Sequence, residues 1–211
     1  AAREFERVYG QKARVQDIII VDPEVFKPNG KPRGDRFMCL GRMGPEKGNL
    51  NAVNLCNKLG LPLDVCGGRG LGRDSDPLDE YELAIIKGCD GERVRFLGEV
   101  DDDTKVNLMQ NARGLLYITD HPEVTSHKIQ EAMFCGCPVV APRLGAQPEI
   151  VTHESNGFLC ATAQEYERAV TGIDDLPVHI HLERVRERWR PETVVGNYVK
   201  LYQEVANGAR W

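Results

Sequence analysis

Short apolar runs alternate with longer helix-like stretches through most of this chain of 211 residues. The runs expected to be strands are residues 36–40, 63–66, 94–97, 115–119, 139–141 and 157–160. The stretches expected to be helices are residues 48–59, 78–87, 103–111, 127–134, 148–151 and 164–172. Strands that alternate with helices form a parallel sheet that is covered on both faces. The sequence therefore predicts an α/β fold with a parallel sheet of about six strands.

The two ends of the chain do not follow this alternation. Residues 1–33 are expected to be a connector that holds a helix over 1–9, a first strand over 17–21 and a run of prolines. Residues 34–175 form the predicted α/β domain, and 176–211 are expected to be closing helices that pack on it, split at Pro191. Apolar residues at helical spacing predict a packing surface there, formed by Val194, Val195, Tyr198, Val199, Leu201, Tyr202 and Val205.

Composition excludes several classes of partner. A net charge of −5 and a pI near 5.6 argue against nucleic acid, which favours a basic surface. No apolar run approaches the ~18 residues of a membrane span, and the N-terminus lacks an apolar signal core. The seven cysteines lie mainly in strand-like or helical contexts, which is typical of reduced thiols. A cytoplasmic protein is expected.

Two cations share a glycine-rich segment between the strand at 36–40 and the next helix. Arg42 and Lys47 are five positions apart within residues 41–48, so both can point at one anion. The helix that follows contributes backbone N–H donors and a partial positive charge, which favour a phosphate. No Gly-Lys-Ser/Thr closes the segment, so it is not a Walker loop. A solvated loop with two surface cations is the simpler interpretation of this segment alone.

Two carboxylates flank the start of the helix at 127–134. Glu123 follows the strand at 115–119 and Glu131 lies within the helix. Open parallel sheets bind ligands at the carboxyl ends of their strands, so these carboxylates and the cations of residues 41–48 are predicted to share one crevice. Cations there can hold a diphosphate, while a carboxylate takes both hydroxyls of a ribose. The pattern outlines a nucleotide-sugar site.

Five motifs, in order, resemble a known family. They are residues 41–48, 94–101, the Glu123 to Glu131 spacing followed by 132–141, the segment 145–149, and 156–158. Together they resemble the carboxyl-terminal, donor-binding half of retaining glycosyltransferases of family 4, the glycosyl transferases group 1. The resemblance covers roughly residues 14–206 and implies the Rossmann-like second half of a GT-B fold.

The resemblance implies roles for the charged residues. Arg42 and Lys47 match the pair that binds the donor diphosphate and neutralises the leaving group. Glu131 matches the residue that binds the ribose, and Glu123 matches the one that contacts the transferred sugar. These four residues imply no cofactor and no metal, because the two cations take the electrostatic task that a metal would perform.

The resemblance also implies contacts made by neighbouring residues. Backbone amides of Ser126, His127 and Lys128 are expected to touch the phosphates, and Val100 is the expected contact to the base. The family usually carries Phe-Gly where this chain has Thr125 and Ser126. Side chains therefore replace a bare glycine where backbone meets sugar and phosphate.

The implied activity is transfer of a hexosyl group from a nucleoside diphosphate sugar to an acceptor. In the family, the acceptor site belongs to an amino-terminal domain that this chain does not contain. The chain is therefore expected to be a donor-binding half that is inactive alone and works with that domain in cis or in trans. Two alternatives stay open: a sugar-nucleotide 2-epimerase on the same architecture, and a noncatalytic nucleotide-sugar-binding module.

Overall fold

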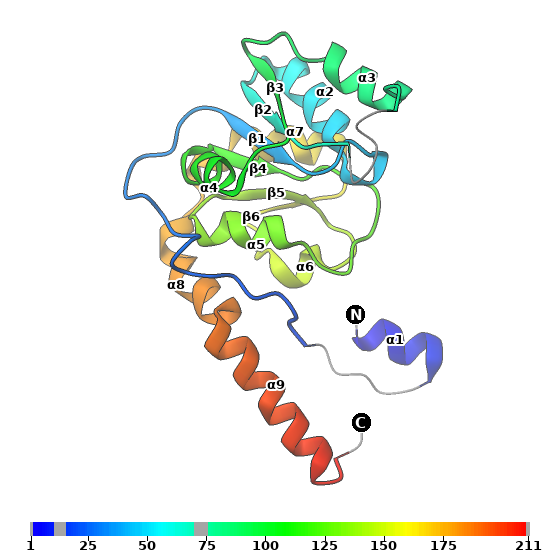
Figure 1. Ribbon diagram of the computed structural model, residues 1–211, viewed down its shortest axis with the longest axis vertical. Helices are drawn as coiled ribbons and strands as arrows, with labels where there is room; N and C mark the ends of the chain where they lie inside the picture. The colour runs from blue at the N-terminus through cyan, green and yellow to red at the C-terminus, as the bar shows by residue number, and fades with distance from the viewer. Residues whose placement is uncertain (1, 11–15, 70–75, 210–211) are drawn as a thin grey trace.

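A six-stranded parallel sheet forms the centre of the protein (Figure 1). The computed structural model describes residues 2–10, 16–69 and 76–209. The strands are β1 (Phe37–Leu40), β2 (Leu63–Cys66), β3 (Val94–Gly98), β4 (Gly114–Leu116), β5 (Val139–Pro142) and β6 (Gly157–Cys160). They lie in the order β3-β2-β1-β4-β5-β6, and every neighbouring pair is parallel. The predicted α/β fold with a parallel sheet of about six strands is confirmed.

Helices connect the strands and continue the chain beyond them. They are α1 (Ala2–Tyr9), η1 (Pro45–Lys47), α2 (Asn49–Leu59), α3 (Glu80–Lys87), α4 (Asp102–Asn111), α5 (His127–Phe134), α6 (Gln147–Ile150), α7 (Ala163–Thr171), η2 (Ile173–Asp175), α8 (Val178–Trp189) and α9 (Pro191–Ala206). Local signals explain several starts. The side chains of Asp79, Asp101 and Thr162 accept hydrogen bonds from the first turns of α3, α4 and α7.

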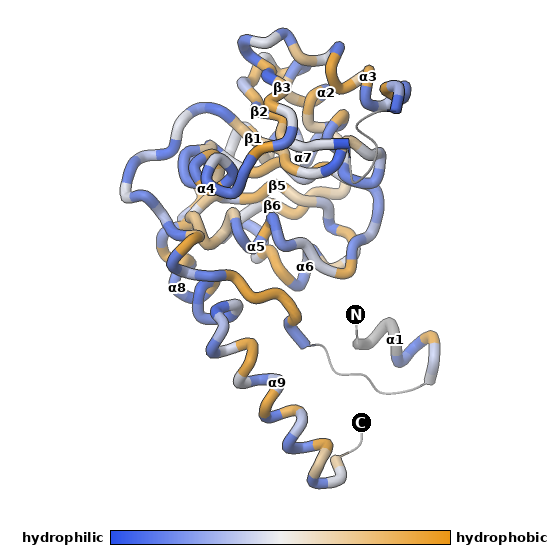
Figure 2. The backbone as a smooth tube through the Cα atoms, viewed as in Figure 1, coloured by the Kyte–Doolittle hydropathy of each residue, from blue (hydrophilic) through white to orange (hydrophobic). Residues whose placement is uncertain are grey.

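Alternation along each strand divides the apolar side chains between two cores. In β1, Phe37 and Cys39 pack toward α2, α3 and α7, while Met38 packs toward α4, α5 and α8. In β5, Val140 faces the first core and Val139 faces the second. Successive side chains of a strand point to opposite faces, so a sheet buried on both sides needs apolar residues at every position. Figure 2 shows the resulting apolar strands at the centre of the fold.

The chain order reverses between β1 and β4, which places a topological switch point there. The strand predicted over 115–119 ends at Leu116, three residues early. Beyond it the backbone leaves the ladder, because the Ile118 carbonyl accepts a hydrogen bond from Asn51 and the Thr119 hydroxyl donates to the Glu46 carbonyl. The end of β4 is thereby tied to the loop and helix that follow β1.

The strand predicted over 17–21 is wrong. Ile19 and Val21 are buried while Ile18 and Ile20 are exposed, so the segment alternates as a strand would. The Val21 N–H, however, donates a hydrogen bond of 3.0 Å to the Trp189 carbonyl at the end of α8. The apolar alternation therefore packs against a helix terminus and the adjoining core and does not join the sheet.

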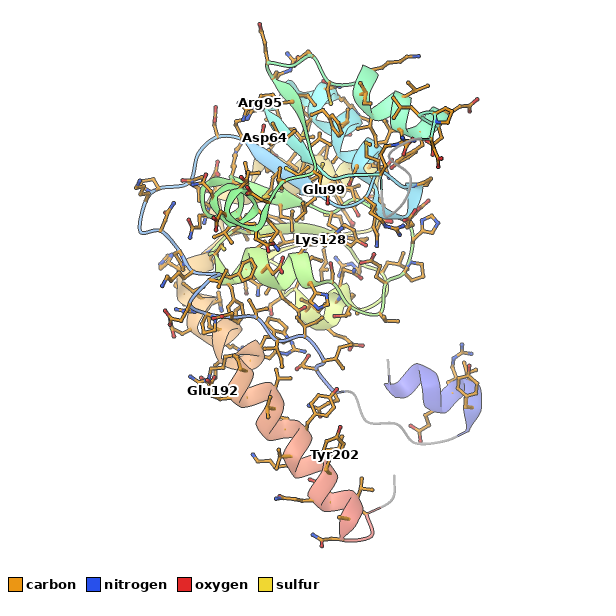
Figure 3. All side chains as sticks on the ribbon, in the orientation of Figure 1. Asp64, Arg95, Glu99, Lys128, Glu192 and Tyr202 are labelled. Atoms are coloured by element: carbon orange, nitrogen blue, oxygen red, sulfur yellow. The ribbon has the colours of Figure 1, made fainter. Side chains whose placement is uncertain are left out.

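The two closing helices differ in their packing. Helix α8 starts at Val178 and buries Val185 and Trp189 against the sheet domain. Helix α9 extends away from the sheet (Figure 1). Of its apolar stripe Val194 is buried, while the residues exposed by about half or more are Val195, Val199, Tyr202 and Val205. Figure 3 shows Tyr202 on the far part of α9.

All seven cysteines fall within the described ranges, and all are free. Among the described helices, none is both long enough and apolar enough to cross a membrane.

Candidate functional site

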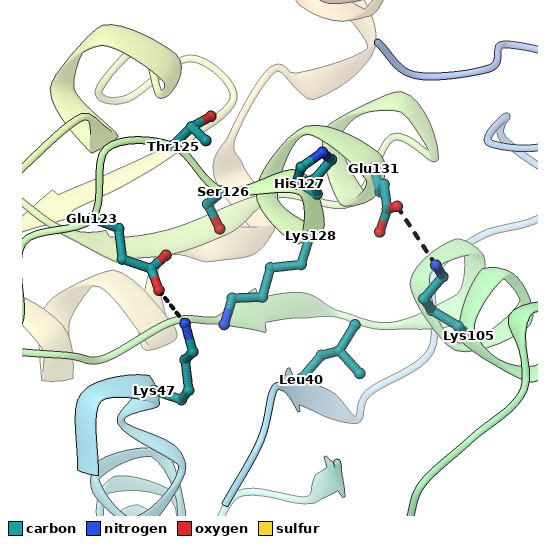
Figure 4. Close-up of a pocket in the computed structure, with 9 residues that line it drawn as sticks. All are labelled: Leu40, Lys47, Lys105, Glu123, Thr125, Ser126, His127, Lys128 and Glu131. Atoms are coloured by element: carbon teal, nitrogen blue, oxygen red, sulfur yellow. Dashed lines mark hydrogen bonds and ion pairs between the residues drawn. The ribbon is translucent and has the colours of Figure 1, made fainter. Parts of the chain in front are cut away.

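A pocket of about 400 Å³ opens at the carboxyl ends of β1 and β4. Its lining residues come from the end of β1, η1, α4, the loop after β4 and α5 (Figure 4). They are Leu40, Lys47, Lys105, Glu123, Thr125, Ser126, His127, Lys128 and Glu131. The structure thus brings together most of the site residues that the sequence singled out, at the switch point where open parallel sheets bind ligands.

Lys47 and Glu123 form an ion pair across the switch point. The Nζ atom of Lys47 lies 2.5 Å from Oε1 of Glu123, and both side chains are largely buried. Burial alone would raise the pKa of Glu123, but the hydrogen bond from Lys47 and the nearby Lys128 charge hold that pKa below its usual range. Glu123 is therefore a carboxylate at neutral pH.

Two glycines allow this pair to form. Gly48 has φ +71°, and a Cβ atom there would lie 2.0 Å from the Ile118 carbonyl oxygen. Gly145 has φ +59°, and a Cβ atom there would lie 2.6 Å from the Glu123 carbonyl oxygen, which also accepts a hydrogen bond from the Ala146 N–H. Close backbone approach at both points carries Lys47 and Glu123 toward each other.

Glu131 has a partner that the sequence did not reveal. Nζ of Lys105, on α4, lies 3.5 Å from Oε1 of Glu131 and 3.1 Å from Oδ1 of Asp102. It also lies 5.1 Å from the centroid of the Phe26 ring. No spacing in the sequence links Lys105 to Glu131, because the contact arises only where α4 and α5 pack side by side.

The first turn of α5 faces the pocket with unused donors. Ser126 precedes the helix and is almost fully buried. No acceptor among the described residues takes the N–H groups of Ser126, His127 or Lys128. The first amides of a helix have no intrahelical acceptor and carry the positive end of the helix dipole. These amides are available to an anion.

The side chain of Lys128 enters the same space. Its Nζ lies 4.0 Å from the centroid of the Tyr117 ring, and Figure 4 shows it directed between Lys47 and Leu40. From the sequence, Lys128 was expected to contribute its backbone amide alone. A charged residue in the first turn of a helix normally points to solvent, so no local signal indicated this direction.

Two predicted contacts do not line the pocket. Arg42 is 62% exposed and its guanidinium lies 3.0 Å from Glu46 in the same loop. Val100 is half-buried in the loop after β3. The role of each in binding stays a prediction.

Within the described ranges, no group of three or more His, Cys, Asp or Glu side chains is placed to hold a metal ion.

Comparison with known proteins gives a family match. The family described as glycosyl transferases group 1 matches residues 21–192. The N-acetyl-alpha-D-glucosaminyl L-malate synthase of Bacillus anthracis is 30% identical over 132 residues, which cover 58% of this chain and 34% of that protein. A probable sucrose-phosphate synthase of Thermosipho melanesiensis is 28% identical over 130 residues, covering 59% of this chain and 31% of that protein. The chain spans about a third of the length of these curated relatives.

Solved structures share the fold. A glycosyltransferase involved in avilamycin A biosynthesis superimposes with a TM-score of 0.78 at 25% identity, over 99% of this chain and 63% of that one. The HepE protein of Anabaena, solved in complex with UDP-glucose, gives a TM-score of 0.71 at 22% identity, over 89% of this chain and 56% of that one. The predicted Rossmann-like half of a GT-B fold is confirmed by these neighbours.

Proposed function

The chain belongs to the glycosyl transferases group 1 family, and from this premise we propose that it is the nucleotide-sugar-binding half of a retaining glycosyltransferase of family 4. Its reaction is transfer of a hexosyl group from a nucleoside diphosphate sugar to an acceptor. The observation that carries the proposal is the convergence of Lys47, Glu123 and the α5 amides on one pocket at the switch point.

Charge supports a diphosphate as the group bound there. Lys47 presents an ammonium, and the first turn of α5 presents N–H donors that have no acceptor among the described residues. When the nucleoside diphosphate departs, negative charge develops on its phosphate oxygens. Hydrogen-bond donors that are already in place stabilise that charge. Arg42 joins by turning its exposed guanidinium from Glu46 toward the phosphates. No metal takes part in the proposed reaction.

Polar groups on either side of the phosphates suit the rest of the donor. Glu131 is proposed to accept hydrogen bonds from the ribose hydroxyls, with Lys105 holding the carboxylate in place. Glu123 is proposed to contact the transferred sugar, and Val100 the base. Thr125 lines the pocket where the family usually has an aromatic side chain, so it contributes a hydroxyl near the sugar.

The acceptor site is proposed to lie on a second domain, in cis or in trans. The structural neighbour with the TM-score of 0.78 is longer than this chain, which covers 63% of it. The exposed apolar residues of α9, such as Val199 and Tyr202, supply a surface that such a domain would cover. Free thiols suit a reducing compartment, so a cytoplasmic location is part of the proposal.

Calorimetric titration tests the proposal directly. The chain is titrated with UDP, GDP and ADP and with the corresponding sugar nucleotides, in buffer with magnesium and in buffer with EDTA. Binding of one nucleotide at similar affinity in both buffers is expected. Lys47→Met is expected to weaken that binding about 10- to 100-fold, because a hydrogen bond to a charged group contributes about 1.5–3 kcal/mol.

A matched control separates the site from general charge effects. Lys58 forms a similar pair with Glu167 between α2 and α7, outside the pocket. Lys58→Met is expected to leave nucleotide affinity unchanged. Absence of binding to every nucleotide would refute the proposal, and epimerised sugar nucleotide formed without an acceptor would favour the 2-epimerase. Binding without transfer by the complete protein would favour a noncatalytic module.

A further inference from the structure

Lys128 occupies an unusual position for a lysine. It starts from the first turn of α5, yet its side chain turns inward to the end of the sheet (Figure 4). Its Nζ lies 4.0 Å from the Tyr117 ring centroid and 3.1 Å from the point that a Cβ atom on Gly41 would occupy. The Cβ atom of Lys47 lies 3.4 Å from that same point. The two lysines therefore converge beside Gly41.

Charge pairing separates Lys128 from the other pocket lysines. Lys47 is paired with Glu123, and Lys105 is paired with Glu131. Among the described residues, no carboxylate forms an ion pair with the Lys128 ammonium, which lies against the Tyr117 ring. The Lys128 ammonium therefore lies against an aromatic face without a carboxylate paired to it, and the nearby charge of Glu123 compensates it only in part.

This compensation is incomplete. An ammonium over an aromatic ring gains about 0.5–2 kcal/mol. Removing an ion from water costs several kcal/mol. Methionine at this position would fill similar space without that cost. A half-buried ammonium that has no carboxylate paired to it indicates a ligand of opposite charge.

We propose that the side chain of Lys128 is a third cation for the donor's diphosphate and acquires its counter-ion when the nucleotide binds. This inference rests on the proposed function and goes beyond it, because there Lys128 contributes only its backbone amide. Lys128 acts as a positioning residue: it holds the phosphates against the α5 amides and beside Lys47.

A proton-linked binding reaction follows from this arrangement. Burial lowers the pKa of Lys128 to about 8, Glu123 opposes that change and Lys47 adds to it. Cys39 on β1 and Glu46 on η1 also face Lys128 and raise its pKa slightly. A bound diphosphate brings negative charge next to the ammonium and raises the pKa further. Near pH 8 the protein must therefore take up a fraction of a proton when the nucleotide binds.

The test is calorimetry with the tightest-binding nucleotide among UDP, GDP and ADP. Titrations at pH 8 in HEPES and in Tris, which differ in ionisation enthalpy, give the number of protons taken up. Wild type is expected to take up a fraction of a proton, and its affinity is expected to fall about tenfold from pH 7 to pH 9. Lys128→Met is expected to take up none and to change affinity less than about twofold over that range.

A second variant and a second measurement complete the test. Lys105→Met removes a pocket lysine that already has a carboxylate partner, so proton uptake is expected to persist. Without nucleotide, Lys128→Met is expected to unfold at the same or higher denaturant concentration than wild type. If wild type binds nucleotide without taking up a proton, or if Lys128→Met still takes one up, the role of Lys128 is overturned and the proposed function is not. No binding by wild type would overturn the proposed function together with it.

Discussion

Replacing Gly48 by alanine is expected to destabilise the protein through one specific contact. Two costs arise from the added methyl group. Gly48 has φ +71°, where an L-residue is strained by about 1 kcal/mol. The new Cβ would also lie 2.0 Å from the Ile118 carbonyl oxygen, although real Cβ atoms essentially never approach other heavy atoms below 3.0 Å. The loop after β1 must therefore move about 1 Å from β4.

The magnitude follows from these two terms. Forcing extra volume into a packed site costs about 1–3 kcal/mol. The shift also strains the Asn51 hydrogen bond to Ile118 and the Thr119 hydrogen bond to Glu46, each contributing about 1 kcal/mol. Backbone strain and the collision together predict that Gly48→Ala lowers the free energy of unfolding by about 2–4 kcal/mol, and strain in the two hydrogen bonds places the loss in the upper part of that range. For a chain of this size that range corresponds to a drop in melting temperature of roughly 4–16 °C.

The same helix supplies a matched control. Gly60 ends α2 as Gly48 precedes it, with φ +67°, but a Cβ atom there would meet nothing within 4 Å. Gly60→Ala therefore carries the backbone strain without the collision, and a loss of about 1 kcal/mol is expected. Urea unfolding followed by circular dichroism compares both variants with wild type. Equal losses for the two variants would refute the argument from close approach at Gly48.

Three further outcomes are expected. Glu131→Gln should weaken UDP binding about tenfold and leave inorganic pyrophosphate binding unchanged, because only UDP has a ribose; equal losses for both ligands in calorimetry would contradict this assignment. The folded-state pKa of Glu123 is lowered, so its stabilisation is present above the unfolded pKa and lost as pH falls below it. Glu123→Gln should therefore unfold more easily than wild type at pH 7, and urea titrations at pH 4 should show a smaller difference. Val194→Ala should lose about 1–2 kcal/mol of stability because Val194 is buried. Val195→Ala, at a half-exposed position, should change stability by less than about 0.5 kcal/mol, and similar losses would show that burial does not decide the cost.

Local sequence signals were enough to predict the sheet and the general location of the site. Apolar runs of strand length alternate with helical stretches. A parallel sheet with helices on both sides buries both faces of such strands. Helix α5 and strand β6 were predicted at the residues where the structure has them, His127–Phe134 and Gly157–Cys160. These signals are local: spacing, glycines and capping residues act within a few positions of each other.

Packing in three dimensions determines which of these residues meet. The alternation over residues 17–21 could not reveal that the Val21 N–H donates to the Trp189 carbonyl. A helix end and a neighbouring strand can each accept hydrogen bonds from an extended segment. Partners far apart in sequence set the state of the pocket: Lys105 reaches Glu131 only through the packing of α4 on α5. Lys128 turns inward because Tyr117 offers a ring and Gly41 leaves room beside it. Charge pairing and burial are properties of three-dimensional neighbours, so the sequence supplied the charged groups and the fold determined which of them lacks a partner.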